Sequence, residues 1–481
     1  MAPFSVNGKW TRRFAWVNLL AVVLFIGSCL ILVQFDWRGN PHNMFAPSTS
    51  LPQRLSREPR MLVYFLICIG SLSWLIGFFT LGMVSSTSAA LTMSLSAMDK
   101  DVERLMAEHK LCKRMQTLAL QAPVSTKPKR RVAILGGTGL VGRALAIRLL
   151  KHKTMELGYV IGSPDTAGKP LRQVWEKKEQ VLRDRYGAQM WQALPFPLEL
   201  DHAVVAAFDE LFQIDQTNLC VISCIAPALG WMEEKLLGCN VPVYSISPYA
   251  RDRVPLVVPE VNYMQLNSPT ARLFKSPNCV SCGVCLVLDA MRKAFGGLEM
   301  VSITTFQSLS GRGDALYDPS LVVGNVLPLG NTEEDTNNKI RDEVCSVLGL
   351  PELKISVTAQ RVYTQRGHYV DVRLGLKIKP QSVHDVKRAL EQYRPLAGWN
   401  LPDAPIQPIV VSLEPKFPRP VQVVQLGEDG MSVHVGHITA NTDRVFDVTL
   451  SLVVDNVARG AYGAALLTAQ VHELMMAASG Q

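Results

Sequence analysis

One segment of the sequence limits the fold more than any other. It reads RVAILGGTGLVGRALAIRLL and covers residues 131–150. A short apolar run typical of a buried strand comes first, three glycines at G-x-x-G-x-x-G spacing from Gly136 follow, and residues 140–150 have helical spacing. Such glycines let the backbone turn tightly and approach a pyrophosphate, and the helix start offers free N–H groups. The order predicts a dinucleotide-binding unit; a glycine turn in another α/β unit is the alternative.

Further strands follow this unit. Residues 157–163, 219–228 and 241–247 are apolar runs that end in small or turn-forming residues. Because helical segments separate them, the sheet should be mostly parallel, as in α/β proteins with a Rossmann-type domain.

Length, charge and cysteine usage narrow the class of protein. The 481 residues are enough for two or three domains. The net charge of +8 is spread out, without a long basic run or interleaved aromatic residues, so we expect no nucleic-acid partner. Most of the 10 cysteines lie in apolar stretches, which indicates buried thiols in a reducing compartment rather than a disulfide framework.

The N-terminal region contains two long uncharged stretches, residues 16–35 and 61–84. Each is long enough to cross a hydrocarbon core of about 30 Å as a helix. The alternatives are a cleaved signal peptide for the first and a buried core helix for the second. We expect a two-helix membrane hairpin within residues 1–90, with the soluble part on the cytosolic, matrix or stromal side; the mitochondrial inner membrane is the first candidate.

Residues 91–128 are predicted to form an amphipathic helix and a linker. One helix face carries the apolar series Leu91, Leu95, Met98, Val102, Leu105 and Cys112. This helix is either a coiled-coil stalk or a surface helix packed on its own domain. The soluble part should begin near Lys129.

The segment KSPNCVSCGVC, residues 275–285, permits two kinds of chemistry. Cys279, Cys282 and Cys285 have the C-x2-C-x2-C spacing of iron–sulfur ligands, yet Cys279 also begins an apolar helix, as nucleophilic thiols do. A complete cluster motif places a fourth cysteine and a proline shortly after the third, where this chain has Asp289 and Ala290. We therefore expect neither a metal nor an iron–sulfur cluster, and we expect Cys282 and Cys285 to be core residues.

Seven motifs, taken in their order along the chain, favour the nucleophilic thiol over the iron–sulfur cluster. They are VAILGGTGLVG, GSPDTAGKPLRQVW, VPLVVPEVN, SPNC, TTFQSLSGRG, RVYTQRGH and DNVARGAYGAA. In this order they resemble aspartate-semialdehyde dehydrogenases of the archaeal and fungal branch, whose relatives include malonyl-CoA reductase. The resemblance covers about residues 130–478. It implies a Rossmann domain over residues 129–275, completed by a C-terminal helix within 455–481, and an α+β catalytic and dimerisation domain over 276–454.

The resemblance also implies roles for individual residues. Cys279 matches the nucleophile, His368 the base, and Gln307 the residue that orients the substrate. Arg361 matches the arginine that binds the substrate carboxylate. Because an odd separation on a strand puts side chains on opposite faces, a bend near Gly367 must bring Arg361 and His368 together.

The remaining implied residues bind substrate or an NAD or NADP cofactor. With Arg361, the substrate set contains Arg251, Glu333, Lys339 and Asn278. The cofactor set contains Gly136, Thr138, Gly139, Leu140, Val141, Ser163, Asp165, Thr166, Ser223 and Asn456. We expect the dipole at the helix start to lower the pKa of Cys279.

This chain departs from the family pattern on the phosphate-binding side. Asp165 stands where NADP-binding members carry arginine, which favours NAD because a carboxylate repels the 2′-phosphate. Tyr249 replaces the phosphate-binding arginine, with Arg251 displaced by two residues. The family lysine falls on Lys339 only if an insertion is allowed, and Arg312 stands where a small residue is usual.

Two functions from different classes follow. The first is a membrane-anchored oxidoreductase that connects an acyl phosphate or thioester to an aldehyde through a cysteine thioester. The alternative is a catalytically drifted dehydrogenase fold that serves as an accessory subunit of a respiratory or photosynthetic membrane complex. The expected partners are the membrane, through residues 16–35 and 61–84, and either further copies of the chain or that larger complex.

Overall fold

A computed structural model of the chain describes residues 101–119, 128–239, 241–268, 270–313, 317–330, 335–426 and 430–479. Two compact units are present, Met1–Ala107 and Glu108–Gln481. The predicted membrane spans lie outside the described residues, and so does Glu333. Among the residues that are described, no helix is both long enough and apolar enough to cross a membrane.

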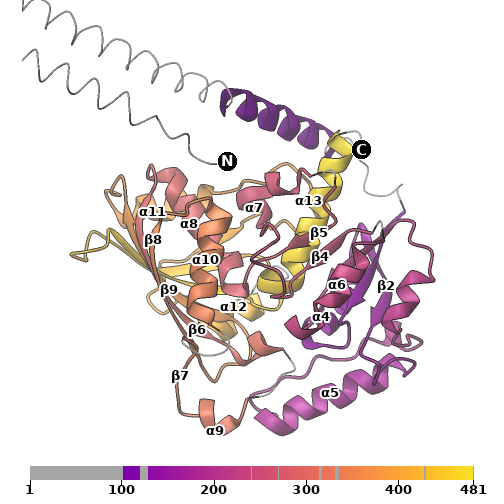
Figure 1. Ribbon diagram of the computed structural model, residues 1–481. Coiled ribbons are helices and arrows are strands. Elements are labelled where there is room, and N and C mark those ends of the chain that lie inside the picture. Colours follow the sequence, from indigo (N-terminus) through magenta and orange to yellow (C-terminus); the bar gives the residue numbers. More distant parts are fainter. Residues whose placement is uncertain are drawn as a thin grey trace, which may run out of the picture. The chain divides into compact units, whose positions relative to one another are not determined.

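The nucleotide domain is built on a five-stranded sheet in the order β2-β1-β3-β4-β5 (Figure 1). Every strand pair in it is parallel, as the alternation of strands and helices predicts. The strands are β1 (Arg130–Leu135), β2 (Met155–Ile161), β3 (Leu219–Ser223), β4 (Val243–Ser245) and β5 (Leu273–Lys275). The helices are α4 (Leu140–Leu150), α5 (Leu171–Tyr186), α6 (Trp231–Leu236) and α7 (Pro259–Asn262), with short 3-10 turns η1 (Leu198–Leu200), η2 (Phe208–Phe212), η3 (Pro227–Leu229) and η4 (Tyr263–Leu266).

The C-terminal helix α13 (Gly463–Ser479) completes this domain. Its buried residues Leu466 and Leu467 belong to the same apolar cluster as Val132 and Ile134 of β1. The C-terminal helix thus packs with the first strand of the nucleotide domain.

The helix before this domain differs from the expectation. Residues 101–119 are helical, but Val102 and Leu105 of the predicted apolar face are exposed. Met115 and Ala119 are buried instead, and Met115 belongs to the apolar cluster of the nucleotide domain. The compact unit thus begins at Glu108 rather than near Lys129, because side chains of this helix belong to its core.

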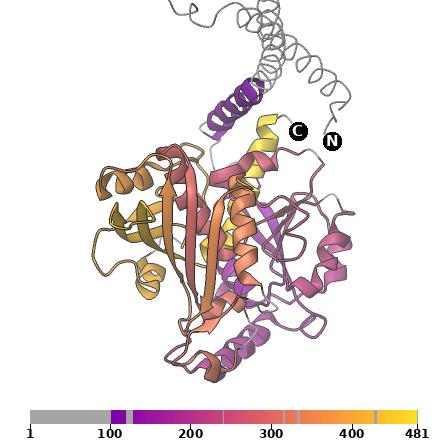
Figure 2. The same cartoon turned by 60° about the vertical axis from the view of Figure 1, so that its left-hand side comes forward.

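The second domain contains a seven-stranded sheet in the order β10-β11-β12-β9-β6-β8-β7. Its strands are β6 (Leu298–Gln307), β7 (Leu327–Pro328), β8 (Lys354–Arg361), β9 (His368–Leu376), β10 (Ile409–Val411), β11 (Val433–Ala440) and β12 (Val448–Val454). Its helical elements are α8 (Cys279–Ala294), η5 (Leu309–Arg312), α9 (Pro319–Val322), α10 (Thr336–Leu348), α11 (Val383–Gln392), α12 (Pro420–Leu426) and the π-helical turn η6 (Ala458–Tyr462). Side chains of α8, α10 and α11 form one apolar core with the sheet, and α10 lies along the strands in both views (Figures 1 and 2).

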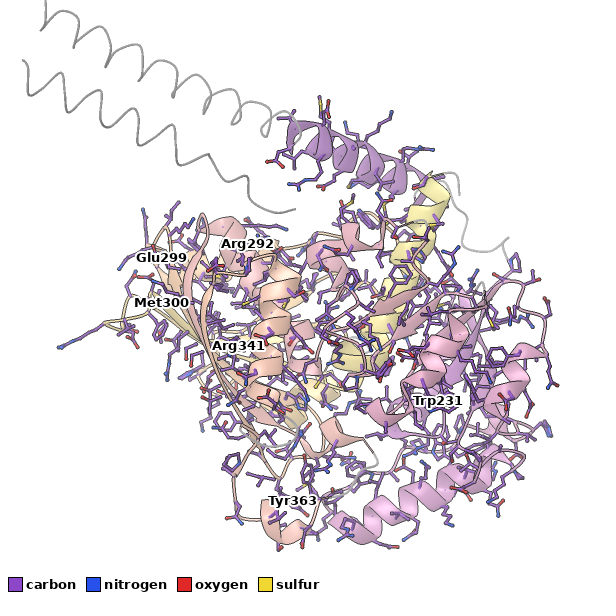
Figure 3. The ribbon with its side chains drawn as sticks, viewed as in Figure 1. Trp231, Arg292, Glu299, Met300, Arg341 and Tyr363 are labelled. Carbon is purple, nitrogen blue, oxygen red and sulfur yellow. The ribbon has the colours of Figure 1, made fainter. Side chains whose placement is uncertain are left out.

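Sheet topology brings distant residues to one end of this domain. Strands β6 and β8 are parallel, with Gln307 opposite Arg361, and β9 is antiparallel to β6. The end of β6 and β8 therefore meets the start of β9, where His368 lies. Close by, Tyr363 connects the domains, because its hydroxyl donates to the Tyr186 carbonyl of α5 at 2.8 Å; Figure 3 labels this side chain.

Candidate active site

Cys279 is the first residue of α8 and follows the last strand of the parallel sheet. Asn278 caps the helix, since its Oδ1 accepts from the Val280 N–H at 2.9 Å. Both residues line a large pocket whose lining also includes the glycine turn after β1. The cap fixes the helix start and with it the direction of the thiol.

His368 lies directly against this thiol. Its Nε2 is 3.1 Å from Cys279 Sγ, although the two residues are 89 positions apart. The imidazole is completely buried at the first position of β9. Gly367 has a φ of +89°, so the bend expected before this strand is confirmed. The distance suits proton transfer between the imidazole and the thiol.

Burial determines the charge states of this pair. It raises the pKa of the Cys279 thiol, and the nearby Arg361 and Arg251 cations only partly offset it. Burial, reinforced by Arg361, also holds the pKa of His368 well below its usual value. The Val280 N–H at the helix start lowers the pKa of Cys279, as expected, but removal from water outweighs this contribution and the favourable charges, so the net shift is upward. Both shifts favour the neutral thiol and the neutral imidazole.

Asn456 holds the segments that surround His368. Its Oδ1 accepts from the Gly367 N–H at 2.9 Å and from the Ser308 and Ser310 hydroxyls at 3.1 and 3.3 Å. Its Nδ2 donates to Ser310 Oγ at 2.9 Å. Asn456 lines the pocket, as predicted for a residue near the cofactor, and it also joins three segments of the chain.

Arg361 and Gln307 lie behind the thiol. Arg361 is buried, with Nη1 donating to the Ser308 carbonyl at 2.9 Å and Nε to the Tyr317 hydroxyl at 3.1 Å. A methyl group on Gly311 would lie 2.7 Å from Arg361 Nη1 and 3.0 Å from His368 Nε2, so these two atoms face the same small space. Gln307 is also buried, and its Nε2 donates to Thr305 Oγ1 at 3.2 Å. Its role toward substrate stays a prediction.

Of the two cationic residues expected to bind substrate from loops, only Arg251 lines the pocket. Arg251 lines the pocket, but its Nη1 is paired with Glu343 of α10 at 3.0 Å and its Nη2 donates to the Ile246 carbonyl. The other carboxylate oxygen of Glu343 accepts from the Asn278 N–H at 2.5 Å. Lys339 is exposed on α10 and is not among the residues that line the pocket.

The pocket has a volume of about 1050 Å³, large enough for a dinucleotide. Gly136, Thr138, Gly139, Leu140 and Val141 line it, as predicted. Gly136 has a φ of +80°, and a methyl group there would lie 2.9 Å from the Cys224 carbonyl oxygen. No side chain caps the start of α4, which leaves its N–H groups to a ligand phosphate. The turn therefore fits a dinucleotide, whose pyrophosphate Gly136 to Val141 would hold.

Apolar side chains from η2, η3 and α6 line part of the pocket, together with Asp209 and Lys235 of the same elements. Phe208, Leu229, Trp231 and Met232 line it, and Phe208 packs edge-to-face against Trp231 with ring centroids 5.7 Å apart. Figure 3 labels Trp231 on α6 in the nucleotide domain. Such a surface suits a flat aromatic base.

Three predicted cofactor residues do not line the pocket. Asp165 is exposed, and the Thr166 hydroxyl donates to the Ser163 carbonyl at 3.0 Å, whereas Ser163 itself lines the pocket. Ser223 is buried, and its hydroxyl donates to Glu233 at 2.6 Å. For Ser223 the prediction of cofactor contact is wrong, because the buried Glu233 engages its hydroxyl.

The other two cysteines of the C-x2-C-x2-C segment are buried on α8, at 1% exposure for Cys282 and 0% for Cys285. They follow Cys279 along one helix, and Cys285 belongs to the apolar core. The prediction that they are core residues is confirmed. Within the described parts of the chain, no three His, Cys, Asp or Glu side chains gather as a metal site requires.

Sequence reasoning missed Ser308, Ser310 and Glu343. The two serines lie within the motif TTFQSLSGRG, directly after Gln307, so this motif could have predicted that they lie near the active site. Glu343 has no such signal, because its position depends on the packing of α10 against α8.

Comparisons with known proteins agree with this geometry. Residues 131–268 match the family described as "Semialdehyde dehydrogenase, NAD binding domain", and residues 288–459 match "Semialdehyde dehydrogenase, dimerisation domain". Aspartate-semialdehyde dehydrogenase of Aspergillus fumigatus is 28% identical over 377 residues, which are 72% of this chain and 98% of that protein. The Cryptococcus neoformans enzyme is 29% identical with the same coverage. Malonyl CoA reductase (NADP) of Metallosphaera sedula is 27% identical over 365 residues, 71% of this chain and 96% of that protein.

A solved structure shares the fold. Aspartate semialdehyde dehydrogenase of Candida albicans with NADP superposes with a TM-score of 0.61 at 24% identity. The match covers 72% of this chain and 99% of that one. The nucleotide and sheet domains therefore correspond to a complete relative.

Proposed function

Because the chain belongs to the semialdehyde dehydrogenase family, we propose that it is an NAD(P)-dependent oxidoreductase that interconverts an aldehyde and an acyl phosphate or acyl thioester. The observation that carries the proposal is the 3.1 Å approach of Cys279 Sγ to His368 Nε2 at the edge of the cofactor pocket. A thiol beside a base is the arrangement that covalent acyl transfer requires.

The chain's own groups supply most of the chemistry. The Cys279 thiolate attacks the carbonyl carbon, and His368 accepts and returns the proton. Asn278 and the start of α8 hold the thiol at the edge of the cofactor pocket. The nicotinamide, when bound, accepts or donates the hydride.

A coupled assay tests this proposal. The purified chain in detergent is supplied with aspartate semialdehyde or malonate semialdehyde and NAD or NADP, with phosphate or coenzyme A as acyl acceptor. We expect nicotinamide reduction that requires Cys279 and His368. Absence of turnover with both aldehydes and both acceptors would contradict the proposal.

We further propose a modest preference for NAD. Asp165 occupies the position that is arginine in NADP-binding relatives, and a carboxylate there repels a 2′-phosphate. Its exposure supports only a small effect, because water screens the charge. Competition between the two cofactors in a binding titration measures it.

An accessory role remains the alternative, and one observation favours it. Arg251 is already paired with Glu343, and Lys339 lies outside the pocket lining, so two cations expected to bind substrate are engaged elsewhere or remote. We also propose that residues 16–35 and 61–84 anchor the chain in a membrane, the mitochondrial inner membrane first. Native gels together with the turnover assay test the accessory role. Co-migration with a large complex without turnover would support that role, whereas an active homo-oligomer would exclude it.

A further inference from the structure

His368 has to transfer protons in a place that disfavours its charged form. The ring is completely buried, and Arg361 lies beside it. An imidazolium there would be a buried cation next to another cation, which is energetically costly. A proton that arrives at Nε2 therefore needs a simultaneous exit from the opposite nitrogen.

Ser308 provides two different partners for that opposite nitrogen. Its backbone N–H donates to His368 Nδ1 at 3.0 Å, which serves the tautomer with the proton on Nε2. Its hydroxyl oxygen is also 3.0 Å from Nδ1 and can accept a proton from it. One residue thus stabilises both neutral tautomers, and only its side chain can carry a proton away.

The hydroxyl continues toward the pocket. Ser308 Oγ is 3.2 Å from Ser310 Oγ, and Ser310 lines the pocket whereas Ser308 is completely buried. Asn456 accepts from both hydroxyls and donates to Ser310, which holds the two side chains in place. A continuous path of hydrogen-bonding groups therefore joins His368 Nδ1 to the open pocket.

We propose that the Ser308 and Ser310 hydroxyls form a proton relay that lets His368 act as a base while it stays neutral. The proposal rests on the proposed function, in which Cys279 carries an acyl group. During hydrolysis of such a thioester, water forms a bond to the acyl carbon and gives a proton to His368 Nε2. Nδ1 passes its proton to Ser308 Oγ, the Ser308 hydroxyl proton moves to Ser310 Oγ, and Ser310 releases its own to pocket water. The C–S bond then breaks, so the products are a carboxylic acid and the Cys279 thiolate.

The charged groups around the pair do not offer another exit. Those that act on Cys279 are Arg361 of β8, Arg251 of the loop after β4 and Glu343 of α10. Arg361 and Arg251 are cations without acceptor capacity. Glu343 accepts from Arg251, from the Asn278 N–H and from the Ser281 hydroxyl, and none of these bonds involves His368.

p-Nitrophenyl acetate tests the relay without cofactor or natural substrate. The burst of p-nitrophenolate reports acylation of Cys279, and the later steady rate reports hydrolysis of the acyl enzyme. Ser308→Ala removes the hydroxyl but keeps the backbone N–H, so we expect about tenfold slower hydrolysis. The burst should keep its amplitude, but its rate should also fall, because the thiol proton taken up by His368 during acylation leaves through the same nitrogen. In mixtures of light and heavy water, the dependence of the hydrolysis rate on deuterium content should change from curved to linear, because fewer protons move together.

Two variants separate a relay from a structural role. Ser308→Thr keeps a hydroxyl and should retain most of the hydrolysis rate and the curved dependence. Ser432→Ala removes a different buried hydroxyl, one that donates to the Gln407 carbonyl at 2.8 Å, and should behave as wild type. Unchanged hydrolysis in Ser308→Ala, or equal loss in the Thr and Ala variants, overturns the relay. A burst that persists in Cys279→Ala would instead refute the nucleophile, and so the proposed function.

Discussion

The two sides of the Cys279 thiol differ in what holds their polar groups. On one side, His368, Ser308 and Asn456 form a buried network whose members lie at strand ends or next to them. On the other side, Arg251 comes from a loop and is paired with Glu343 rather than exposed to a ligand. Strand ends are fixed by sheet register, whereas loop residues can be replaced without disturbing the fold. The contrast indicates a retained reaction centre beside an altered substrate-binding surface.

The largest expected effect tests the reaction centre. Cys279→Ser should lower acyl transfer roughly 10³-fold or more, because a serine hydroxyl is a much weaker nucleophile than a thiolate. Cys282→Ala on the same helix is the matched control and should keep activity within about threefold, since Cys282 is buried and donates only to the Pro277 carbonyl. Burst kinetics measure both variants. Substantial acylation in Cys279→Ser, or its loss in Cys282→Ala, would place the nucleophile elsewhere.

The next effect tests the opposite side. Glu343→Ala leaves the partly buried Arg251 guanidinium and the Asn278 N–H without their carboxylate and should lower the free energy of unfolding by about 3 kcal/mol. Asp342→Ala, one position away on α10, removes an exposed pair with Arg341 and should cost no more than about 0.5 kcal/mol. Urea denaturation measures both changes. Equal losses for the two variants would mean that Arg251 finds water or another partner once Glu343 is gone.

Gly460 tests how closely the C-terminal turn supports the thiol. A methyl group at this position would lie 2.6 Å from Cys279 Cβ and 2.9 Å from its Cα. Gly460→Ala should therefore displace the start of α8, lower the stability by about 1–3 kcal/mol and reduce acylation several-fold. Gly238→Ala is the control, because the nearest atom to its added methyl is the Lys235 carbonyl oxygen at 3.6 Å. A normal acylation rate in Gly460→Ala would show that the turn around Gly460 moves to accommodate the methyl group without displacing Cys279.

The pH dependence of thiol reactivity connects the two sides. Burial raises the pKa of Cys279, the two arginines lower it, and Glu343 raises it further. Glu343→Gln removes the negative charge, so the midpoint of iodoacetamide alkylation should move to lower pH and the rate below that midpoint should rise about threefold. Mass mapping assigns the alkylated residue. A midpoint that moves to higher pH would mean that the loss of Arg251 positioning outweighs the removed charge.

The sequence was most informative where the backbone alone sets the geometry. The glycine turn, α4 and the parallel strands follow from local pattern, and the pairing of Cys279 with His368 follows from the resemblance to the family. Met115 and Glu343 were missed, and Ser223 was expected at the cofactor but contacts Glu233, because their environments come from packing between distant segments. The net rise in the thiol pKa was missed for the same reason: the lowering effect of the helix start is local, whereas burial depends on the whole fold.

The smallest expected effect concerns cofactor choice, where the same distinction between local pattern and tertiary placement applies. Asp165 has the sequence position of a specificity residue, yet it is exposed and does not line the pocket, whereas Ser163 and Pro164 do. Asp165→Arg should therefore shift the preference toward NADP by only about threefold, the scale of a screened surface charge. Asp184→Arg, another exposed acid of this domain, should not change the ratio of the two dissociation constants. A shift of tenfold or more for Asp165→Arg alone would mean that this loop closes on the bound cofactor and brings position 165 into contact with the ribose.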